Sequence, residues 1–109
     1  MGRFIKGKVV VTPFPFSDLT ASKKRPALVV ADLEGDDIIV CLITSQHAKD
    51  DYAISLASDD FANGQLKQNN NIRPNRLFTI DAKIILYRIG TLKKEKIEKV
   101  AKKIIEIFS

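Results

Sequence analysis

The stretch that decides the fold is Ala27–Ile43, which reads ALVVADLEGDDIIVCLI. It holds two runs rich in β-branched residues on either side of the turn-forming residues Glu34–Asp37. Such a pattern predicts two antiparallel strands joined by a tight turn. A third β-branched run, Val9–Val11, predicts an earlier strand. The first half of the chain is therefore expected to fold as a small antiparallel sheet.

Further strand patterns follow in the second half of the chain. A short alternating pattern predicts a strand over 52–56, and an apolar run predicts a last strand over 84–89. Between them, a strand is expected to begin near Arg76 and to run to Asp81. An earlier start is not expected, because Pro74 lacks the N–H that a central ladder position needs.

The C-terminal residues carry the pattern of one amphipathic helix. Apolar side chains recur at spacings of three and four residues, with lysines mostly between them, at Ile97, Val100, Ala101, Ile104, Ile105 and Phe108. Thr91 is placed to cap the helix N-terminus. The expected fold class is mainly β, an antiparallel barrel or sandwich of five to seven short strands with one C-terminal amphipathic α-helix covering an edge or an end.

Length and composition limit what the chain can be. It has 109 residues, 45% of them hydrophobic, and we expect a single domain over 1–109. No apolar run approaches the roughly 18 residues of a membrane-spanning helix, and the first residues lack the apolar stretch of a secretory signal. A cytoplasmic location is therefore expected. The one cysteine, Cys41, lies in an apolar run and is expected to pack in the core.

The distribution of charge favours an anionic partner. The net charge is +5 and the isoelectric point is near 9.4, which is typical of proteins that bind nucleic acid. Residues 32–60 hold eight acidic and one basic side chain, whereas the segments on either side are basic. Lysines on a solvated helix face account for part of this excess. Charge segregated in this way can also steer a charged ligand to its site.

A connector of about twelve residues, Pro13–Lys24, is expected between the first two strands. Loops of this length in small domains are usually functional or mobile. Phe14 and Phe16 offer aromatic faces for base stacking, and Lys23 and Lys24 offer charge for phosphates. The alternative is that the two phenylalanines belong to the core, which is favoured slightly for Phe14.

Candidate chemistry rests on arginine. The sequence has no Gly-rich phosphate loop and no His, Cys or carboxylate cluster with metal-ligand spacing, so no metal or other cofactor is expected. Arg25 and Arg73 each precede a proline, which restrains the backbone from which the side chain starts. A guanidinium presents a planar fork suited to phosphodiesters. The alternative is that Arg25 pairs with an acidic residue of the middle segment and Arg73 is merely exposed.

Hydrogen-bonding side chains end the third predicted strand. Thr44 begins a run of four such residues that ends at His47. In a small sheet, strand ends and the loops after them are where polar groups meet ligands, and Thr44 could donate to a phosphoryl oxygen. The alternative is that these residues only begin a turn. His47 could act as a general base or could simply be solvated.

The order of these strings along the chain resembles the MazF/PemK toxins of type II toxin–antitoxin systems, in their PemK-like branch. The similarity covers nearly the whole chain, through Gly7–Val10, Pro13–Asp18, Lys24–Val29, Ile43–Gln46, Ile72–Pro74, Thr79–Asp81 and Ile89–Leu92. The resemblance implies an SH3-like barrel with a C-terminal helix. It further implies a homodimer that cleaves single-stranded RNA without a metal and is restrained by a cognate acidic antitoxin.

The resemblance also assigns candidate site residues. Arg25 and Thr44 match the catalytic arginine and threonine of the family, and Arg73 matches the arginine of an Arg-x-Asp pair found in some members. Asn75 stands where that pair has its aspartate, and an amide cannot accept a proton as a carboxylate does. The candidate RNA-binding residues are Phe16, Ser17, Lys23, Lys24, Ser45, Gln46, Asn75 and Arg76.

Metal-free RNA cleavage uses the 2′-OH as nucleophile and leaves a 2′,3′-cyclic phosphate and a 5′-OH. The arginines suit the stabilisation of the charged transition state but cannot act as ordinary bases. Asp18, Asp81, His47 and water all stay open as the proton acceptor. Two other functions fit the same sequence: a CcdB-like toxin that binds DNA gyrase without cleaving RNA, and a nucleic-acid-binding barrel without toxicity.

Overall fold

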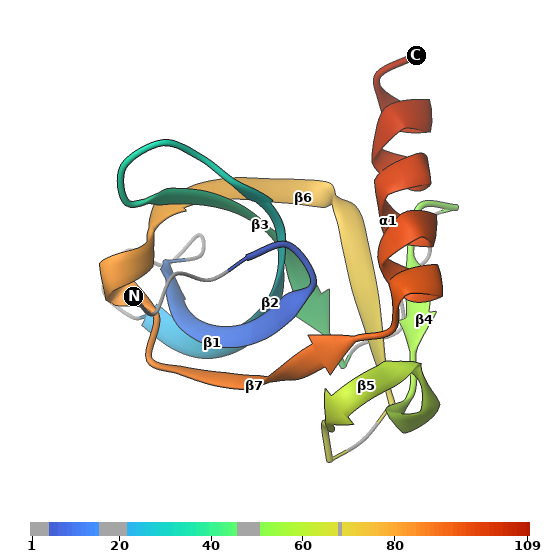
Figure 1. The fold of residues 1–109 in the computed structure, drawn as a ribbon, viewed down its shortest axis with the longest axis horizontal. Helices are drawn as coiled ribbons and strands as arrows, with labels where there is room; N and C mark the ends of the chain where they lie inside the picture. Colours follow the sequence, from blue (N-terminus) through green and yellow to red (C-terminus); the bar gives the residue numbers. More distant parts are fainter. Residues whose placement is uncertain (1–4, 16–21, 46–50, 68) are drawn as a thin grey trace.

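The computed structural model describes residues 5–15, 22–45, 51–67 and 69–109. Its strands form one antiparallel sheet that curls on itself, and a helix stands beside it (Figure 1). The elements are β1 (Lys8–Pro15), β2 (Ser22–Asp32), β3 (Asp37–Thr44), β4 (Ile54–Leu56), η1 (Ser58–Asp60), β5 (Phe61–Gly64), β6 (Asn70–Asp81), η2 (Ala82–Ile84), β7 (Tyr87–Leu92) and α1 (Lys94–Ile107). The mainly β class with seven strands and a C-terminal helix is confirmed.

The strand order across the sheet is β4-β6-β3-β2-β1-β7-β5. The three strands predicted from the first half of the chain, β1, β2 and β3, lie side by side at its centre. The tight turn expected at Glu34–Asp37 joins β2 to β3, with Gly35 at a positive φ of 70°. β6 and β7 then pair with the outer edges of this centre, so the second half of the chain closes around the first.

The predicted connector between the first two strands is largely strand. β1 continues to Pro15 and β2 begins at Ser22, with Pro13 opposite Lys24 in the ladder. The ladder continues because a proline in a strand loses only its own N–H bond. The rest of the predicted connector, residues 16–21, lies outside the described residues.

β6 begins at Asn70, six residues before the predicted start near Arg76. Its register on β3 shifts at the proline: Leu77 lies opposite Cys41, but Arg73 lies opposite the next residue, Leu42. Residues 74–76 are therefore left out of the ladder, and β6 turns a corner there (Figure 1). The missing N–H of Pro74 is tolerated because it falls in this irregularity rather than in a regular ladder.

The last strand and the helix start later than predicted. Residues 82–84 form η2, so β7 runs over Tyr87–Leu92 instead of 84–89. Thr91 lies inside β7, where its hydroxyl accepts a hydrogen bond of 3.0 Å from Lys8 Nζ. It therefore does not cap the helix, and Lys93 takes the N-cap position without a side-chain hydrogen bond.

The two faces of the sheet carry separate hydrophobic clusters, because successive residues of a strand point to opposite sides. The first cluster comprises Val9, Leu28, Cys41, Ile43, Ile54, Leu56, Phe61, Ile72, Leu92 and Val100, and so includes the helix. The second comprises Val10, Ala27, Val29, Ile38, Val40 and Leu42. The expected core position of Cys41 is confirmed, since its side chain is fully buried.

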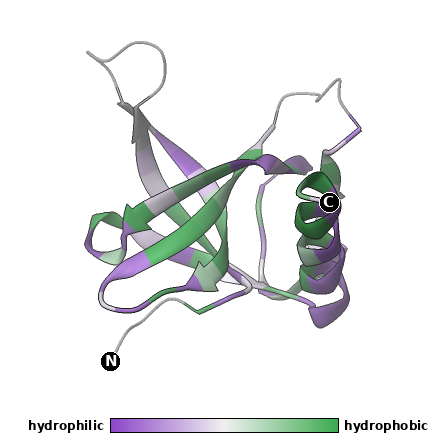
Figure 2. Ribbon diagram, turned by 90° about the horizontal axis from the view of Figure 1, so that it is seen from above, coloured by the Kyte–Doolittle hydropathy of each residue, from purple (hydrophilic) through white to green (hydrophobic). Residues whose placement is uncertain are grey.

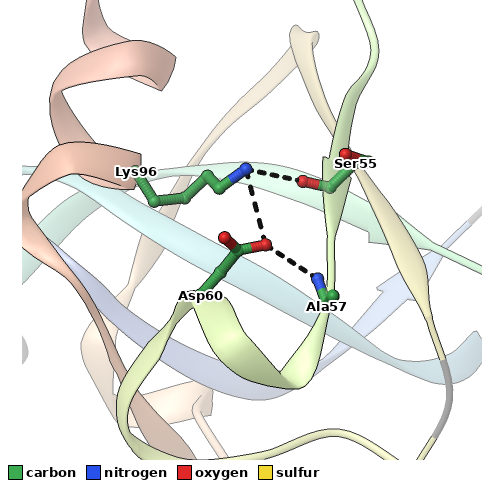
Figure 3. A network of polar contacts seen from close by, with 4 residues as sticks. All are labelled: Ser55, Ala57, Asp60 and Lys96. Carbon is green, nitrogen blue, oxygen red and sulfur yellow. Dashed lines mark hydrogen bonds and ion pairs between the residues drawn. The ribbon is translucent and has the colours of Figure 1, made fainter.

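The helix packs on the first-cluster face and stands to one side of the curled sheet (Figure 2). A polar network also fixes it: Lys96 Nζ donates to the carbonyl oxygen of Ser55 at 3.0 Å and lies 3.4 Å from Asp60 Oδ2, which accepts from the Ala57 N–H at 2.8 Å (Figure 3). The end of the predicted apolar stripe is not covered, because Phe108 is 75% exposed. Over the described residues, no helix has the length and apolar character needed to cross a membrane.

Candidate functional site: three arginines on one face of the sheet

Pairing registers bring the predicted catalytic residues together. Thr12 lies opposite Arg25 in the β1–β2 ladder, and Thr44 lies opposite Asn71 in the β3–β6 ladder. The β2–β3 ladder pairs Ala27 with Leu42. Continued by two residues, this register sets Arg25 opposite Thr44. Directly paired residues share a face, so one row crosses four strands, in the order Thr12, Arg25, Thr44 and Asn71.

A second row lies directly beside the first on the same face. Its residues are Arg88, Val10, Ala27, Leu42 and Arg73, on β7, β1, β2, β3 and β6. Arg73 is therefore a diagonal neighbour of Thr44. Opposite residues in antiparallel strands have Cβ atoms about 4.5–5.5 Å apart and diagonal ones about 7–8 Å. Both distances are within the span of an arginine side chain.

These two rows, named the strand-end rows after Thr44 at the end of β3, are strongly basic. They contain Arg25, Arg73 and Arg88 and no carboxylate, although the whole chain has 13 acidic residues. Arg25 and Arg73 are half-buried, and burial strengthens the field of a charge. Two hydroxyls, of Thr12 and Thr44, lie in the same row as Arg25. The arrangement can hold an anion and can stabilise negative charge that develops on it.

A cavity of about 590 Å³ opens at the same end of the sheet. Its lining consists of Val11, Lys24, Arg25, Pro26, Ile43, Ser45, Gln65, Leu66, Lys67, Asn70, Tyr87 and Ile89. Three of these residues are cationic and none is acidic. Most of the lining strand residues belong to the first-cluster face, whereas Arg25 belongs to the strand-end rows. Arg25 thus connects the cavity to the rows.

The structure brings together only part of the predicted RNA-binding set. Lys24 and Ser45 line the cavity. Asn75 and Arg76 are exposed at the corner of β6 and do not line it. Lys23 lies in β2 opposite Phe14. Phe16, Ser17 and Gln46 lie outside the described residues, so the predictions made for them stay predictions.

Of the three side chains considered as proton acceptors, Asp81 alone belongs to the described residues, and it lies too far from Thr44 to act at this site. Asp81 lies opposite Asp37, the first residue of β3, whereas Thr44 is the last residue of that strand. At about 3.3 Å per residue the two ends are roughly 20 Å apart along β3. The carboxylate instead accepts a hydrogen bond of 2.8 Å from the Lys83 N–H and caps η2. Asp18 and His47 lie outside the described residues.

Sequence reasoning missed several residues of the site. Gln65, Lys67, Asn70 and Tyr87 line the cavity, and Arg88 extends the second row. The signal for Gln65, Lys67 and Asn70 was weak, because they follow a predicted turn at Phe61–Gly64 in a segment without a motif. Tyr87 and Arg88 were predicted as strand residues, but their register on β1 could not be deduced. Within the described ranges, no group of three or more His, Cys, Asp or Glu side chains is arranged to hold a metal ion.

Comparison with protein families identifies the chain. Residues 5–108 match the model of the PemK-like, MazF-like toxin of type II toxin–antitoxin systems. The chain belongs to this toxin family. The resemblance read from the sequence strings is thereby confirmed. Among curated proteins, none matches the sequence.

Solved structures of MazF toxins share the fold. The toxin MazF-mt6 of Mycobacterium tuberculosis superposes with a TM-score of 0.73 at 17% identity, over 93% of this chain and 95% of that one. The MazE–MazF complex of Deinococcus radiodurans gives 0.76 at 14%, over 96% and 95%. A mycobacterial endoribonuclease in complex with its cognate antitoxin gives 0.76 at 10%, over 96% and 94%. At such identities the likeness establishes the architecture of this PemK-like chain. Its chemistry has to be inferred from its own residues.

Proposed function

We propose that this chain is a toxin that acts as an endoribonuclease on single-stranded RNA, with mRNA as its target. The observation that carries the proposal is the pair of strand-end rows, which hold Arg25, Thr44 and Arg73 on one face of the described sheet. A scissile phosphodiester there would meet positive charge from two sides and a hydroxyl donor. Two of the similar solved structures are described as endoribonucleases, which supports the same reaction.

The reaction we propose needs no metal, because the guanidinium groups supply the positive charge. The 2′-oxygen of the substrate gives up its proton to a base and bonds to phosphorus. The bond between phosphorus and the 5′-oxygen then breaks, and that oxygen takes a proton as it leaves. The products are a 2′,3′-cyclic phosphate and a 5′-OH. DNA lacks the 2′-OH and is not a substrate.

Each of the three residues has one role in this scheme. Arg25 and Arg73 stabilise the extra negative charge of the pentacovalent transition state. Fixed hydrogen-bond donors lower a barrier most when they are aimed at charge that develops in the transition state. Thr44 donates its hydroxyl to a phosphoryl oxygen and orients the phosphate. No arginine serves as the base, because a guanidinium does not give up its proton in proteins and has no acceptor site. We assign the role of general base to no side chain of the two rows.

We further propose that the toxin is a cytoplasmic homodimer restrained by an acidic antitoxin. An apolar groove of about 460 Å³ beside α1 supports a partner, since exposed Phe78, Ile105 and Phe108 contribute to its lining. Structures of relatives in complex with an antitoxin support the second part. A negatively charged inhibitor would also suit the basic strand-end rows.

The test is a cleavage assay on purified protein with defined single-stranded RNA in EDTA. We expect fragments that end in 2′,3′-cyclic phosphate, identified by mass spectrometry, and no cleavage of the same sequence with 2′-O-methyl groups. Intact RNA together with inhibition of DNA gyrase would support a CcdB-like toxin instead. Intact RNA that is merely bound would support a nucleic-acid-binding barrel.

The matched variant is Arg25→Ala. Removal of one charge-stabilising donor typically lowers the rate by about 10²–10³-fold. We expect a loss of that size with an unchanged circular dichroism spectrum, because Arg25 is not part of either hydrophobic cluster. Cleavage at the wild-type rate would remove Arg25 from the proposed site.

A further inference from the structure

The cavity beside Arg25 has a composition that the cleavage chemistry does not explain. The reaction at the scissile phosphate uses the strand-end rows, but most of the cavity lining comes from the opposite face of the sheet and from the segment 65–67. At about 590 Å³ the cavity falls in the range of about 300–1,000 Å³ that small-ligand sites occupy. It therefore offers room for a ligand group beyond the phosphate.

The cavity lining combines three kinds of surface. Val11, Ile43, Leu66 and Ile89 form an apolar wall. Ser45, Gln65 and Asn70 provide hydroxyl and amide groups, which both donate and accept hydrogen bonds. Lys24, Arg25 and Lys67 add positive charge. Tyr87 lines the same space and is 53% exposed, so part of its ring is open to a ligand.

We infer that this cavity binds one nucleotide of the RNA substrate adjacent to the scissile phosphate, with its base stacked on Tyr87. The inference rests on the proposed function, since it names a substrate subsite of that reaction. The base meets the aromatic ring and the exposed amide of Gln65, while Lys24 and Lys67 hold its phosphate. Arg25 belongs to the strand-end rows and also lines the cavity, so its guanidinium can contact the phosphate that links the two places.

The mixed lining favours a nucleotide over an acidic peptide. A peptide carboxylate needs only donors, which lysine and arginine supply. A base edge presents donors and acceptors together, and every base has a flat face that stacks on an aromatic ring. The Gln65 amide and the Tyr87 ring fit a base, whereas a peptide carboxylate would use neither.

The test measures binding of four single-stranded 2′-O-methyl RNA octamers, one for each base, which cannot be cleaved because the nucleophile is blocked. Stacking of one base on an aromatic side chain is usually worth about ten- to a hundredfold in affinity. We expect Tyr87→Ala and Tyr87→Leu to weaken binding of the preferred octamer by about tenfold or more, and Tyr87→Phe to stay within about threefold of wild type. Gln65→Ala should reduce the difference in affinity between the four octamers.

Tyr52→Ala is the matched control, because Tyr52 is the other tyrosine of the chain, is 43% exposed and does not line the cavity. It should leave all four affinities unchanged. The inference is overturned if Tyr87→Ala binds the octamers as wild type does, or if it lowers affinity for a hexaglutamate peptide but not for RNA. With either result, the wild-type protein would still cleave RNA. If instead the proposed function is wrong, the wild-type protein would not cleave RNA, although its binding of the octamers would still depend on Tyr87.

Discussion

The ion pair between Lys96 of α1 and Asp60 of η1 is predicted to contribute measurably to the free energy of unfolding (Figure 3). Only 12% of the Lys96 side chain and 26% of the Asp60 side chain is exposed. Lys96→Met keeps much of the apolar stem but removes both the ion pair at 3.4 Å and the hydrogen bond of 3.0 Å to the Ser55 carbonyl. Asp60 then retains the Ala57 N–H.

The expected cost lies between two limits. An exposed ion pair contributes about 0–1 kcal/mol, and breaking a fully buried one costs about 3–5 kcal/mol. A charge-assisted hydrogen bond adds about 1.5–3 kcal/mol. With both partners mostly buried, we expect Lys96→Met to lower the free energy of unfolding by about 2 kcal/mol, which corresponds to roughly 10 °C in Tm for a chain of this size.

Urea denaturation of four proteins measures this value: wild type, Lys96→Met, Asp60→Asn and the double variant. The coupling energy of the cycle isolates the pair. Lys103→Met is the matched control, because Lys103 pairs with the more exposed Glu106 at 3.3 Å on the same helix. It should change stability by less than about 0.5 kcal/mol. If Lys96→Met costs no more than this control, the reasoning from burial is refuted.

Three further predictions concern other parts of the molecule. Gly90→Ala should destabilise the protein by about 2 kcal/mol or more in thermal unfolding, because a Cβ at Gly90 would overlap the carbonyl oxygen of Asn63 on the neighbouring strand; an unchanged Tm would show that β5 can move away. Burial raises the pKa of the Cys41 thiol from 9.0 to about 12, so the unfolded thiol ionises first as the pH rises. Between pH 9 and 12 wild type should therefore lose up to about 1.4 kcal/mol per pH unit relative to Cys41→Val, and parallel stability curves would contradict this. Thr44→Val should lower the rate of RNA cleavage by about 10²-fold at unchanged Tm, whereas cleavage at the wild-type rate, or an equal loss from Thr12→Val, would contradict a specific role for the Thr44 hydroxyl.

The strands were predictable where the pattern is local. The β-branched runs of β1, β2 and β3 and the tight turn before Asp37 depend on neighbouring residues, and all are confirmed. The start of β6 was not predictable, because Pro74 is tolerated only through a register shift against β3 that sequence spacing does not reveal. The end of the apolar stripe was also misjudged. The periodicity predicts that Phe108 lies on the face of the helix that packs on the sheet, but no described element covers its side chain.

The candidate site was predictable in its residue types but not in its surroundings. Arg25, Thr44 and Arg73 stood out because guanidinium and hydroxyl groups suit a phosphodiester, and the described sheet sets all three on one face. The cavity lining from 65–67 had no such signal. A glutamine and a lysine after a turn are ordinary surface residues until the β5–β7 and β3–β6 pairings bring them beside Tyr87.

Irregular pairing, rather than the strands themselves, places the three candidate catalytic residues together. Near the turn Asp32 pairs with Ile38, and this register would set Arg25 opposite Ser45 and leave Thr44 on the other face. Val30 is an extra residue in β2 and shifts the register by one, which turns Thr44 to the face of Arg25.

The second irregularity has the same effect on β6. The register that pairs Leu77 with Cys41 would set Arg76 opposite Leu42 and turn Arg73 to the opposite face. Three extra residues at Pro74 move Arg73 into the position opposite Leu42. Each insertion holds an odd number of residues, and an even number would leave the face unchanged, because side chains alternate with a period of two. A sheet of the same strands without these two shifts would keep Thr44 on one face and turn Arg25 and Arg73 to the other.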